Sequence, residues 1–168
     1  MAKCRLILAS LLFICLVVPA NGQMEKGDSE VQFLGMFMTF TEAGAGGFFM
    51  VQGRYGYYMT DNVQLGIGPS YMGDTEGDFG MLGLSAFGNY VILLEDGKTA
   101  PYGGAQFYRY EPVQAGAKGS SLIGLTGGVK YYLTPKTAID GNANYQFALE
   151  SGAGGGVLLF LVGLSFLF

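Results

Sequence analysis

The chain has 168 residues, enough for one domain, and its 9 basic and 13 acidic residues give a net charge of −4. This acidic balance argues against a nucleic-acid partner, because such binding depends mainly on basic residues that neutralise phosphates. Charged residues make up only 13% of the sequence, compared with roughly 25% in soluble domains.

The beginning of the chain has the order of segments found in a secretory signal peptide. Lys3 and Arg5 form a short basic start, and an apolar run interrupted only by Ser10 follows over residues 6–18. This run is too short to cross a bilayer as a helix, which takes about 20 residues. We expect a signal peptide over residues 1–22 that is cleaved after Gly22, with cleavage after Ala20 as the alternative. Both cysteines of the chain lie in this segment, so no disulfide is expected in the remainder.

After a short polar lead over residues 23–30, the chain repeats a pattern of about ten alternating residues followed by turn residues. The pattern predicts strands at residues 31–40, 48–58, 63–72, 80–93, 101–110, 121–133, 138–148 and 157–168. Each is long enough to cross a bilayer at a tilt, which takes about 9–11 residues, and an even strand number is typical of single-chain bacterial barrels. The predicted fold class is therefore all-β: an eight-stranded antiparallel up-and-down transmembrane β-barrel over residues 31–168.

The alternating strands have one apolar and one polar face, and the polar residues indicate which face lies inside. A sheet face in water would carry mostly Lys and Glu, whereas this one carries Gln, Asn, Ser, Thr and Gly with few charges. Small polar side chains fit the narrow interior of an eight-stranded barrel, so the apolar face is expected in lipid. The strand at 101–110 has no predicted orientation, because Gln106 and Arg109 lie on opposite faces. The predicted lumenal polar network consists of Arg54, Gln64, Lys130, Asp140, Asn142, Asn144 and Gln146.

Within this network, Lys130 and Asp140 are predicted to form a lumenal ion pair. A hairpin centred on Pro135 places the two residues opposite each other on neighbouring strands, and both face inward by parity. We expect the network to take the place of a hydrophobic core. An ion path is not expected, because eight strands leave an interior just filled by side chains.

The connections between the predicted strands fall into two alternating sets. Short turns at 60–62, 94–99 and 134–137 form one set, which we assign to the periplasmic side because the barrel starts and ends there. A tyrosine girdle is expected beside these turns, since aromatic residues gather at membrane interfaces. It consists of Tyr55, Tyr57, Tyr90, Tyr102 and Tyr131.

The other set of connections, assigned to the outside of the cell, includes a run of acidic residues. Asp74, Glu76 and Asp78 resemble the beginning of a calcium-binding loop, but the bidentate Glu at the twelfth position of such loops is missing. We interpret this run as a solvated turn, because most charge clusters are exposed to solvent, and the sequence leaves cation binding open. No cofactor or metal site is predicted.

The last predicted strand is the most apolar one. Its outward face carries Phe160, Val162, Leu164, Phe166 and the terminal Phe168. An exposed edge strand of this kind would promote aggregation, whereas pairing with the first strand removes the edge. The strand therefore favours a closed barrel.

The chain resembles the OmpA/OmpX-like small outer-membrane β-barrel family at GYYMTDNVQLG (56–66), PYGG (101–104), GGVKYYLTP (127–135) and the terminal Phe168. The resemblance covers most of the chain after the signal peptide. It implies a place in the bacterial outer membrane, among lipid and lipopolysaccharide. It also implies insertion by the outer-membrane barrel assembly machinery, which reads the C-terminal strand. Family members act as structural, adhesive or stress-related surface proteins, and the short outer loops of this chain argue against an adhesin.

Catalysis is not expected, because the sequence contains no histidine. The small outer-membrane barrel enzymes that modify lipid, which resemble this chain in size, place a His base beside a Ser. We therefore predict a non-enzymatic, monomeric outer-membrane barrel with a structural or surface-interaction role. Two alternatives remain: a lipid-modifying enzyme that uses a carboxylate base, and a soluble lipocalin-like barrel that binds an apolar ligand.

Overall fold

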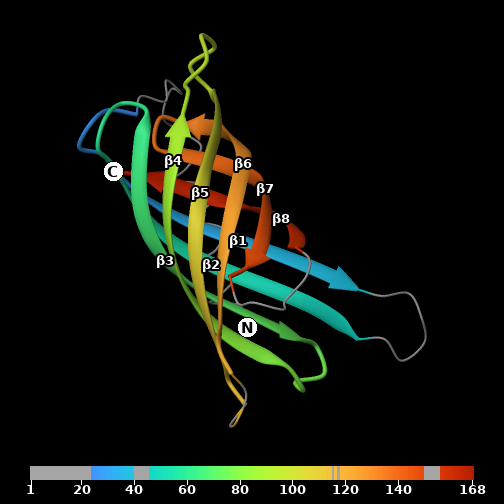
Figure 1. Ribbon diagram of the computed structural model, residues 1–168. Coiled ribbons are helices and arrows are strands. Elements are labelled where there is room, and N and C mark those ends of the chain that lie inside the picture. Colours follow the sequence, from blue (N-terminus) through green and yellow to red (C-terminus); the bar gives the residue numbers. More distant parts are fainter. Residues whose placement is uncertain (1–23, 40–45, 115, 117, 150–155) are drawn as a thin grey trace.

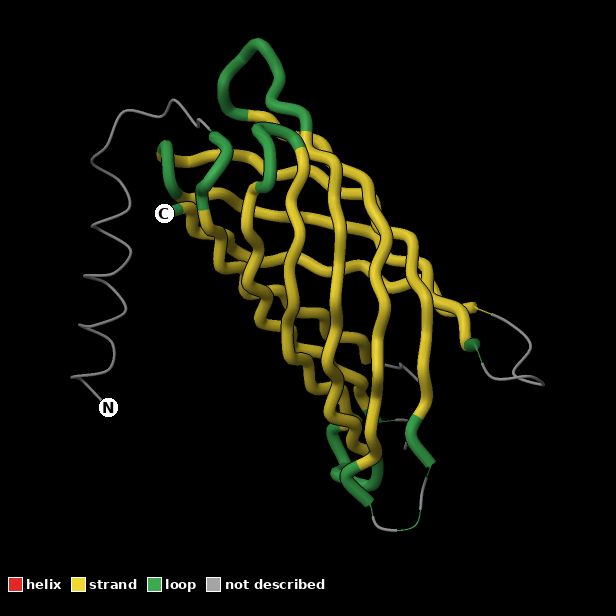
Figure 2. The backbone as a smooth tube through the Cα atoms, turned by 60° about the vertical axis from the view of Figure 1, so that its left-hand side comes forward, coloured by secondary structure: helices red, strands yellow, loops and turns green. Residues whose placement is uncertain are grey.

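The computed structural model describes residues 24–39, 46–114, 116, 118–149 and 156–168. The predicted signal peptide therefore lies outside the described residues. Eight antiparallel strands follow one another and close into a barrel (Figure 1, Figure 2), which confirms the predicted fold class. The strands are β1 (Ser29–Thr39), β2 (Gly47–Tyr58), β3 (Val63–Asp74), β4 (Gly80–Val91), β5 (Thr99–Pro112), β6 (Ser120–Thr134), β7 (Thr137–Ala148) and β8 (Gly156–Leu167).

The barrel has two distinct ends. The short turns after β2, β4 and β6 lie at one end, which we call the turn end, and the Ser29 amide donates a hydrogen bond to the Phe168 carbonyl there (3.3 Å). The connections after β3 and β5 lie at the opposite end, which we call the loop end. The observed strands begin and end close to the predicted positions, except that β1 starts inside the predicted polar lead, at Ser29. No helix in the described part of the chain is long and apolar enough to cross a membrane.

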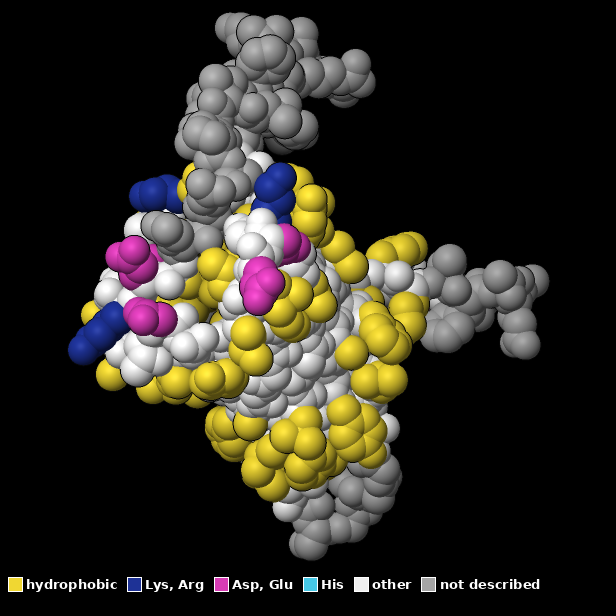
Figure 3. Space-filling view, turned by 90° about the horizontal axis from the view of Figure 1, so that it is seen from above, with side chains coloured by type: hydrophobic (Ala, Val, Ile, Leu, Met, Phe, Trp, Pro, Cys, Tyr) yellow, Lys and Arg dark blue, Asp and Glu magenta, His cyan; other side chains and the backbone are white. Residues whose placement is uncertain are grey.

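Alternate side chains of every strand point into the barrel, because successive residues of a strand face opposite sides. In β2, Gln52 and Arg54 are buried, whereas Val51 and Tyr55 are 52% and 50% exposed. The outward side chains are mostly apolar and form a band around the barrel, which we call the apolar belt. Its most exposed members include Phe33, Ile67, Leu82, Leu125, Phe160 and Val162. In Figure 3, hydrophobic side chains surround the flanks, and charged side chains gather at the turn end, which faces the viewer.

The interior is divided into three layers along the barrel. An aromatic cluster around Tyr58 and Tyr132 fills the turn end, where Met24 packs against it. Buried polar side chains occupy the middle of the barrel. A second apolar cluster around Met50 and Leu161 lies toward the loop end. The expectation that a polar network takes the place of a hydrophobic core is therefore correct only for the middle layer, since apolar clusters fill the interior on both sides of it.

The closure between β1 and β8 is incomplete. β1 pairs with β8 only over Glu30–Gly35, opposite Val162–Leu167. The remainder of β1 pairs with β2 as far as Thr39, and the remainder of β8 pairs with β7 as far as Gly156. An unpaired segment of the wall, which we call the seam, therefore separates β1 and β8 toward the loop end.

The turn from β4 to β5 is held by the side chain of Asp96. Its carboxylate accepts hydrogen bonds from the backbone amides of Lys98 and Thr99 (2.9 and 2.8 Å) and from the Thr99 hydroxyl (2.5 Å). Gly97 has a φ of 64°, a left-handed conformation that favours glycine. The hydrogen bond from the Thr99 hydroxyl is the main reason that the pKa of the Asp96 carboxyl lies below its ordinary value.

Candidate functional site

An ion pair is buried in the lumen between two strands that are distant in the sequence. The Lys130 ammonium on β6 lies 2.5 Å from the Glu30 carboxylate on β1, and neither side chain is more than 1% exposed. The Tyr58 hydroxyl and the Gln64 amide both donate hydrogen bonds to the same carboxylate. These contacts join β1, β2, β3 and β6 across the lumen, so they fix the interior at the turn-end side of the polar layer.

The predicted ion pair between Lys130 and Asp140 is wrong, although its register is right. The two residues face each other across β6 and β7 as expected. The ammonium of Lys130, however, reaches across the lumen to Glu30, while the Asp140 carboxylate accepts hydrogen bonds from the Tyr102 hydroxyl (2.8 Å) and the Gln32 amide (3.3 Å). The prediction missed the pair with Glu30 because that residue was assigned to the polar lead before the first strand.

The structure places Tyr102 inside the barrel, which corrects its assignment to the tyrosine girdle. The even-numbered residues of β5 face inward, so Gln106 is buried and Arg109 points outward. Arg109 forms an exposed ion pair with Glu111 (2.6 Å), so the guanidinium is paired outside the lumen. The other four members of the predicted girdle are exposed: Tyr55, Tyr57, Tyr90 and Tyr131.

All seven residues of the predicted lumenal polar network are buried inside the barrel, but they are not joined into one network. The Arg54 guanidinium stacks on the Phe87 ring, with its carbon 3.7 Å from the ring centroid. Its Nε and Nη2 make no hydrogen bond to any residue that the structure describes. Asn144 donates a hydrogen bond to the Tyr108 hydroxyl (2.7 Å), which forms a separate polar group nearer the loop end.

Four ionisable side chains are buried in the described lumen, and their formal charges cancel. They are the carboxylates of Glu30 and Asp140 and the cations of Arg54 and Lys130. Because a buried charge is stable only when it is compensated, this balance is what a filled, low-dielectric interior requires. Three of these four residues were predicted from the sequence to face the lumen, whereas Glu30 was not.

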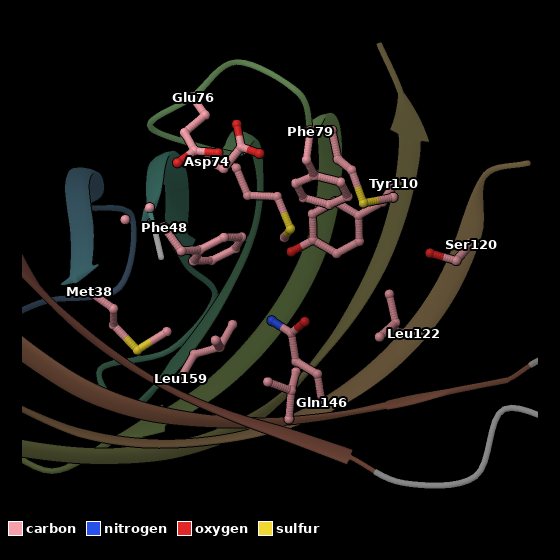
Figure 4. A pocket seen from close by; sticks show the side chains of 15 residues that line it. Met38, Phe48, Asp74, Glu76, Phe79, Tyr110, Ser120, Leu122, Gln146 and Leu159 are labelled. Carbon is pink, nitrogen blue, oxygen red and sulfur yellow. The ribbon is translucent and has the colours of Figure 1, made fainter. Parts of the chain in front are cut away.

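A cavity of about 730 Å³ opens at the loop end, and we call it the mouth cavity. Inward residues of several strands line it, among them Met38, Met72, Met81, Leu122 and Leu159. Figure 4 shows that Tyr110 and Gln146 point into it as well. Sequence analysis missed this cavity, because β1 and β8 carry apolar residues on both faces near the loop end and give no alternation there.

The acidic run between β3 and β4 forms a turn at the rim of the mouth cavity. The Asp74 carboxylate accepts a hydrogen bond from the Gly77 amide (2.7 Å), and Glu76 lines the cavity beside it. Asp78 is exposed and does not line the cavity. Within the described residues, no group of three or more His, Cys, Asp or Glu side chains is arranged to hold a metal ion.

The outward face of β8 lies in the apolar belt. Phe160, Val162 and Phe168 are 63–65% exposed, and Leu164 is 43% exposed. Phe166 is less exposed, because its ring contacts that of Phe33 on β1 edge to face (6.5 Å between centroids). The C-terminal residues named from the sequence therefore all face away from the lumen, next to the closing strand.

Comparison with known proteins gives matches of structure and none of sequence. No protein-family model matches the chain, and no curated protein matches it. The N-terminal β-barrel domain of Pseudomonas aeruginosa OprF is similar with a TM-score of 0.67 and 18% identity, covering 85% of this chain and 98% of that one. Neisserial surface protein A (NspA) has a TM-score of 0.61 and 17% identity, with 83% and 96% covered. Yersinia pestis Ail, in a phospholipid bilayer nanodisc, has a TM-score of 0.52 and 13% identity, with 84% and 99% covered.

The chain therefore has the fold of small eight-stranded outer-membrane β-barrels. This is the fold that the resemblance to the OmpA/OmpX-like family implies. At these identities the similarity concerns the architecture alone. The role of the chain has to be inferred from its own residues.

Proposed function

We propose that the chain is a non-enzymatic integral protein of the bacterial outer membrane with a structural or surface-interaction role. The observation that carries this proposal is the apolar belt. Large side chains such as Leu125 and Val162 are 59% and 64% exposed, and similar residues surround the whole barrel. A belt of this size would cause aggregation in water, whereas it is the normal outer surface of a barrel in lipid.

The ends of the barrel support an orientation in the membrane. The exposed members of the tyrosine girdle, such as Tyr57 and Tyr90, lie near the turn end, where aromatic residues would meet the interface. We assign the turn end to the periplasm and the loop end to the outside of the cell. The partners are then outer-membrane lipid and lipopolysaccharide, with the barrel assembly machinery acting on β8. We propose that the barrel acts as a monomer.

Cell fractionation tests the location. In cells that express the tagged protein, we expect it in the outer-membrane fraction, and we expect the unboiled protein to migrate differently from the boiled protein on a gel. A folded, β-rich protein dissolved in a detergent-free periplasmic extract would contradict the proposal. That result would favour the soluble lipocalin-like barrel instead.

A lipid assay tests the non-enzymatic part of the proposal. Purified protein is incubated with lipopolysaccharide and phospholipid, and the lipids are analysed by mass spectrometry. We expect no change in the acyl chains or head groups. A new lipid species that depends on the folded protein would favour the alternative of a lipid-modifying enzyme.

A further inference from the structure

The walls of the mouth cavity are suited to an apolar molecule. Three of the chain's eight methionines, Met38, Met72 and Met81, line it, together with aromatic residues that include Phe48 and Phe79. Its volume of about 730 Å³ lies within the range of small-molecule sites, about 300–1,000 Å³. Methionine side chains are flexible and polarisable, so a wall of this kind adapts to ligands of different shape.

Two buried hydrogen-bond donors lie at the inner end of the mouth cavity, and neither has a well-placed acceptor among the described residues. Tyr110 and Gln146 are 1% and 2% exposed. The Tyr110 hydroxyl and the Gln146 Nε2 lie beside each other, but neither has a hydrogen bond of good geometry to any residue that the structure describes. Figure 4 shows both side chains directed into the cavity. Because buried donors are normally paired, this inner end is suited to a ligand that brings an oxygen acceptor.

The rim of the mouth cavity limits the charge of the ligand. The carboxylates of Asp74 and Glu76 line the outer edge, and none of the described residues that line the cavity is basic. An anionic molecule would be repelled at this rim, since like charges in a partly desolvated site disfavour binding. The rim therefore favours a ligand without negative charge.

The seam connects the mouth cavity with the flank of the barrel. Met38 on β1 and Leu159 on β8 both line the cavity, and both lie in the segments where these two strands are not paired. The wall of the cavity is thus interrupted on the side of the apolar belt. A ligand dissolved in hydrocarbon would have the least strand pairing to cross on this side.

We propose that the mouth cavity binds an uncharged, membrane-soluble molecule that has an apolar chain and one oxygen acceptor, such as a medium-chain alcohol. The apolar part of the ligand lies between the methionine and aromatic side chains. Its oxygen accepts hydrogen bonds from the Tyr110 hydroxyl and the Gln146 amide. Supply of the ligand from the bilayer rests on the proposed membrane location, whereas the shape and polarity of the cavity do not.

Methionine methyl NMR of the folded protein in phospholipid nanodiscs tests this proposal, with 1-octanol as the probe. Insertion into the nanodisc is checked first, and failure to insert would contradict both the membrane location and this proposal. In the inserted protein, we expect saturable shifts of the Met38, Met72 and Met81 signals. Met24 and Met59 lie at the turn end, so their signals should not move. Equal or non-saturable shifts of all the signals would indicate general partitioning and would overturn the proposal without affecting the membrane location.

Two variants test the polar inner end of the cavity. Tyr110→Phe removes a hydroxyl that makes no hydrogen bond in the described protein, so the barrel should still fold. We expect it to weaken 1-octanol binding about fivefold, which corresponds to a net hydrogen bond of about 1 kcal/mol, and to leave binding of octane unchanged. Tyr132→Phe is the matched control, because its hydroxyl is also buried, has no hydrogen bond of good geometry to the described residues, and lies at the turn end. Equal 1-octanol affinity of both variants and the unmodified protein would contradict the proposed role of Tyr110.

Discussion

Lys130 and Glu30 are the residues on which the polar layer depends most strongly. Both are buried, and the ammonium has the Glu30 carboxylate and the Tyr58 hydroxyl as its hydrogen-bond acceptors. Moving a charge out of water costs several kcal/mol, and the partner offsets this cost only while both charges are present. The pair therefore makes each of its members sensitive to loss of the other.

Replacement of Glu30 should destabilise the barrel more than replacement of Asp140. Glu30→Gln leaves the buried Lys130 ammonium without its ion-pair partner, and we expect a loss of about 3–5 kcal/mol in the free energy of unfolding. Asp140→Asn keeps an oxygen acceptor for the Tyr102 hydroxyl, so a smaller loss is expected. Urea unfolding of the lipid-embedded protein measures both values.

The double variant Glu30→Gln with Lys130→Met serves as the control for this prediction. It removes both charges at once, so no uncompensated charge is left buried, which is the main cost of breaking a buried ion pair. We therefore expect it to recover most of the stability that Glu30→Gln loses. Equal losses for the single and double variants would show that the charge pair is not the cause.

Asp96 gives a prediction for the dependence of stability on pH. Its pKa in the folded protein is lowered, chiefly because the Thr99 hydroxyl donates a hydrogen bond to the carboxylate. A lowered pKa stabilises the folded state at pH values above the unfolded pKa, and this contribution is lost as the pH falls through the folded pKa. Asp96→Asn should therefore show a slightly flatter decline of stability below about pH 4 in acid unfolding curves. An identical pH profile for both proteins would contradict this role.

At the scale of the strands, the sequence pattern was sufficient wherever the two faces differ in polarity. β3, β6 and β7 alternate between apolar and polar residues, and their predicted inward residues, such as Gln64 and Asn144, are buried. The register of β6 and β7 also followed from their short turn, since a tight hairpin fixes which residues face each other. Local pattern and turn geometry together therefore predicted most of the fold.

The remaining features depend on contacts that no local pattern contains. Glu30 meets Lys130 only because β1 lies across the lumen from β6, and the two residues are distant in the sequence. Tyr102 was wrongly assigned to the tyrosine girdle, because Arg109, which forms its ion pair with Glu111 outside the barrel, obscures the parity of β5. The mouth cavity was missed because Met38, which lines it, is an apolar residue on the inward face of an already apolar β1.

The closing strand pair gives a prediction at the scale of the sheet. A Cβ atom at Gly163 on β8 would lie 1.8 Å from the carbonyl oxygen of Phe33 on β1, so the strands would have to separate. We expect Gly163→Ala to destabilise the barrel by at least about 1–3 kcal/mol, the usual cost of overpacking. The difference in gel migration between boiled and unboiled protein, measured across a urea series, gives the folded fraction.

Gly53→Ala on β2 is the matched control for this glycine. A Cβ atom there would have no neighbour within 4 Å, because Gly53 lies on the outward face of its strand. We expect its unfolding midpoint to stay close to that of the unmodified protein. If the two variants unfolded alike, tight contact between β1 and β8 would not be the reason for a glycine at position 163.

At the scale of the whole molecule, the distribution of polarity is opposite to that of a soluble barrel. The middle of the lumen holds amides, hydroxyls and four ionisable side chains whose formal charges balance, whereas the outer surface is a continuous apolar belt. The closed wall pairs the backbone groups of neighbouring strands except at the seam, where the cavity adjoins the belt. This arrangement is stable only if hydrocarbon surrounds the belt, because water would leave its apolar area exposed.

A charge placed in the apolar belt tests this claim directly. Leu125 is 59% exposed near the middle of β6, and Leu133 is 45% exposed near the end of the same strand, on the same face. In a bilayer, Leu125→Arg should cost about 2–4 kcal/mol and Leu133→Arg at most about 1 kcal/mol, because the cost of a charge falls toward the interface. In water, both changes would be nearly neutral, since exposed positions tolerate Arg. Unfolding in lipid vesicles measures the difference between the two variants, and equal values would mean that the belt does not face hydrocarbon.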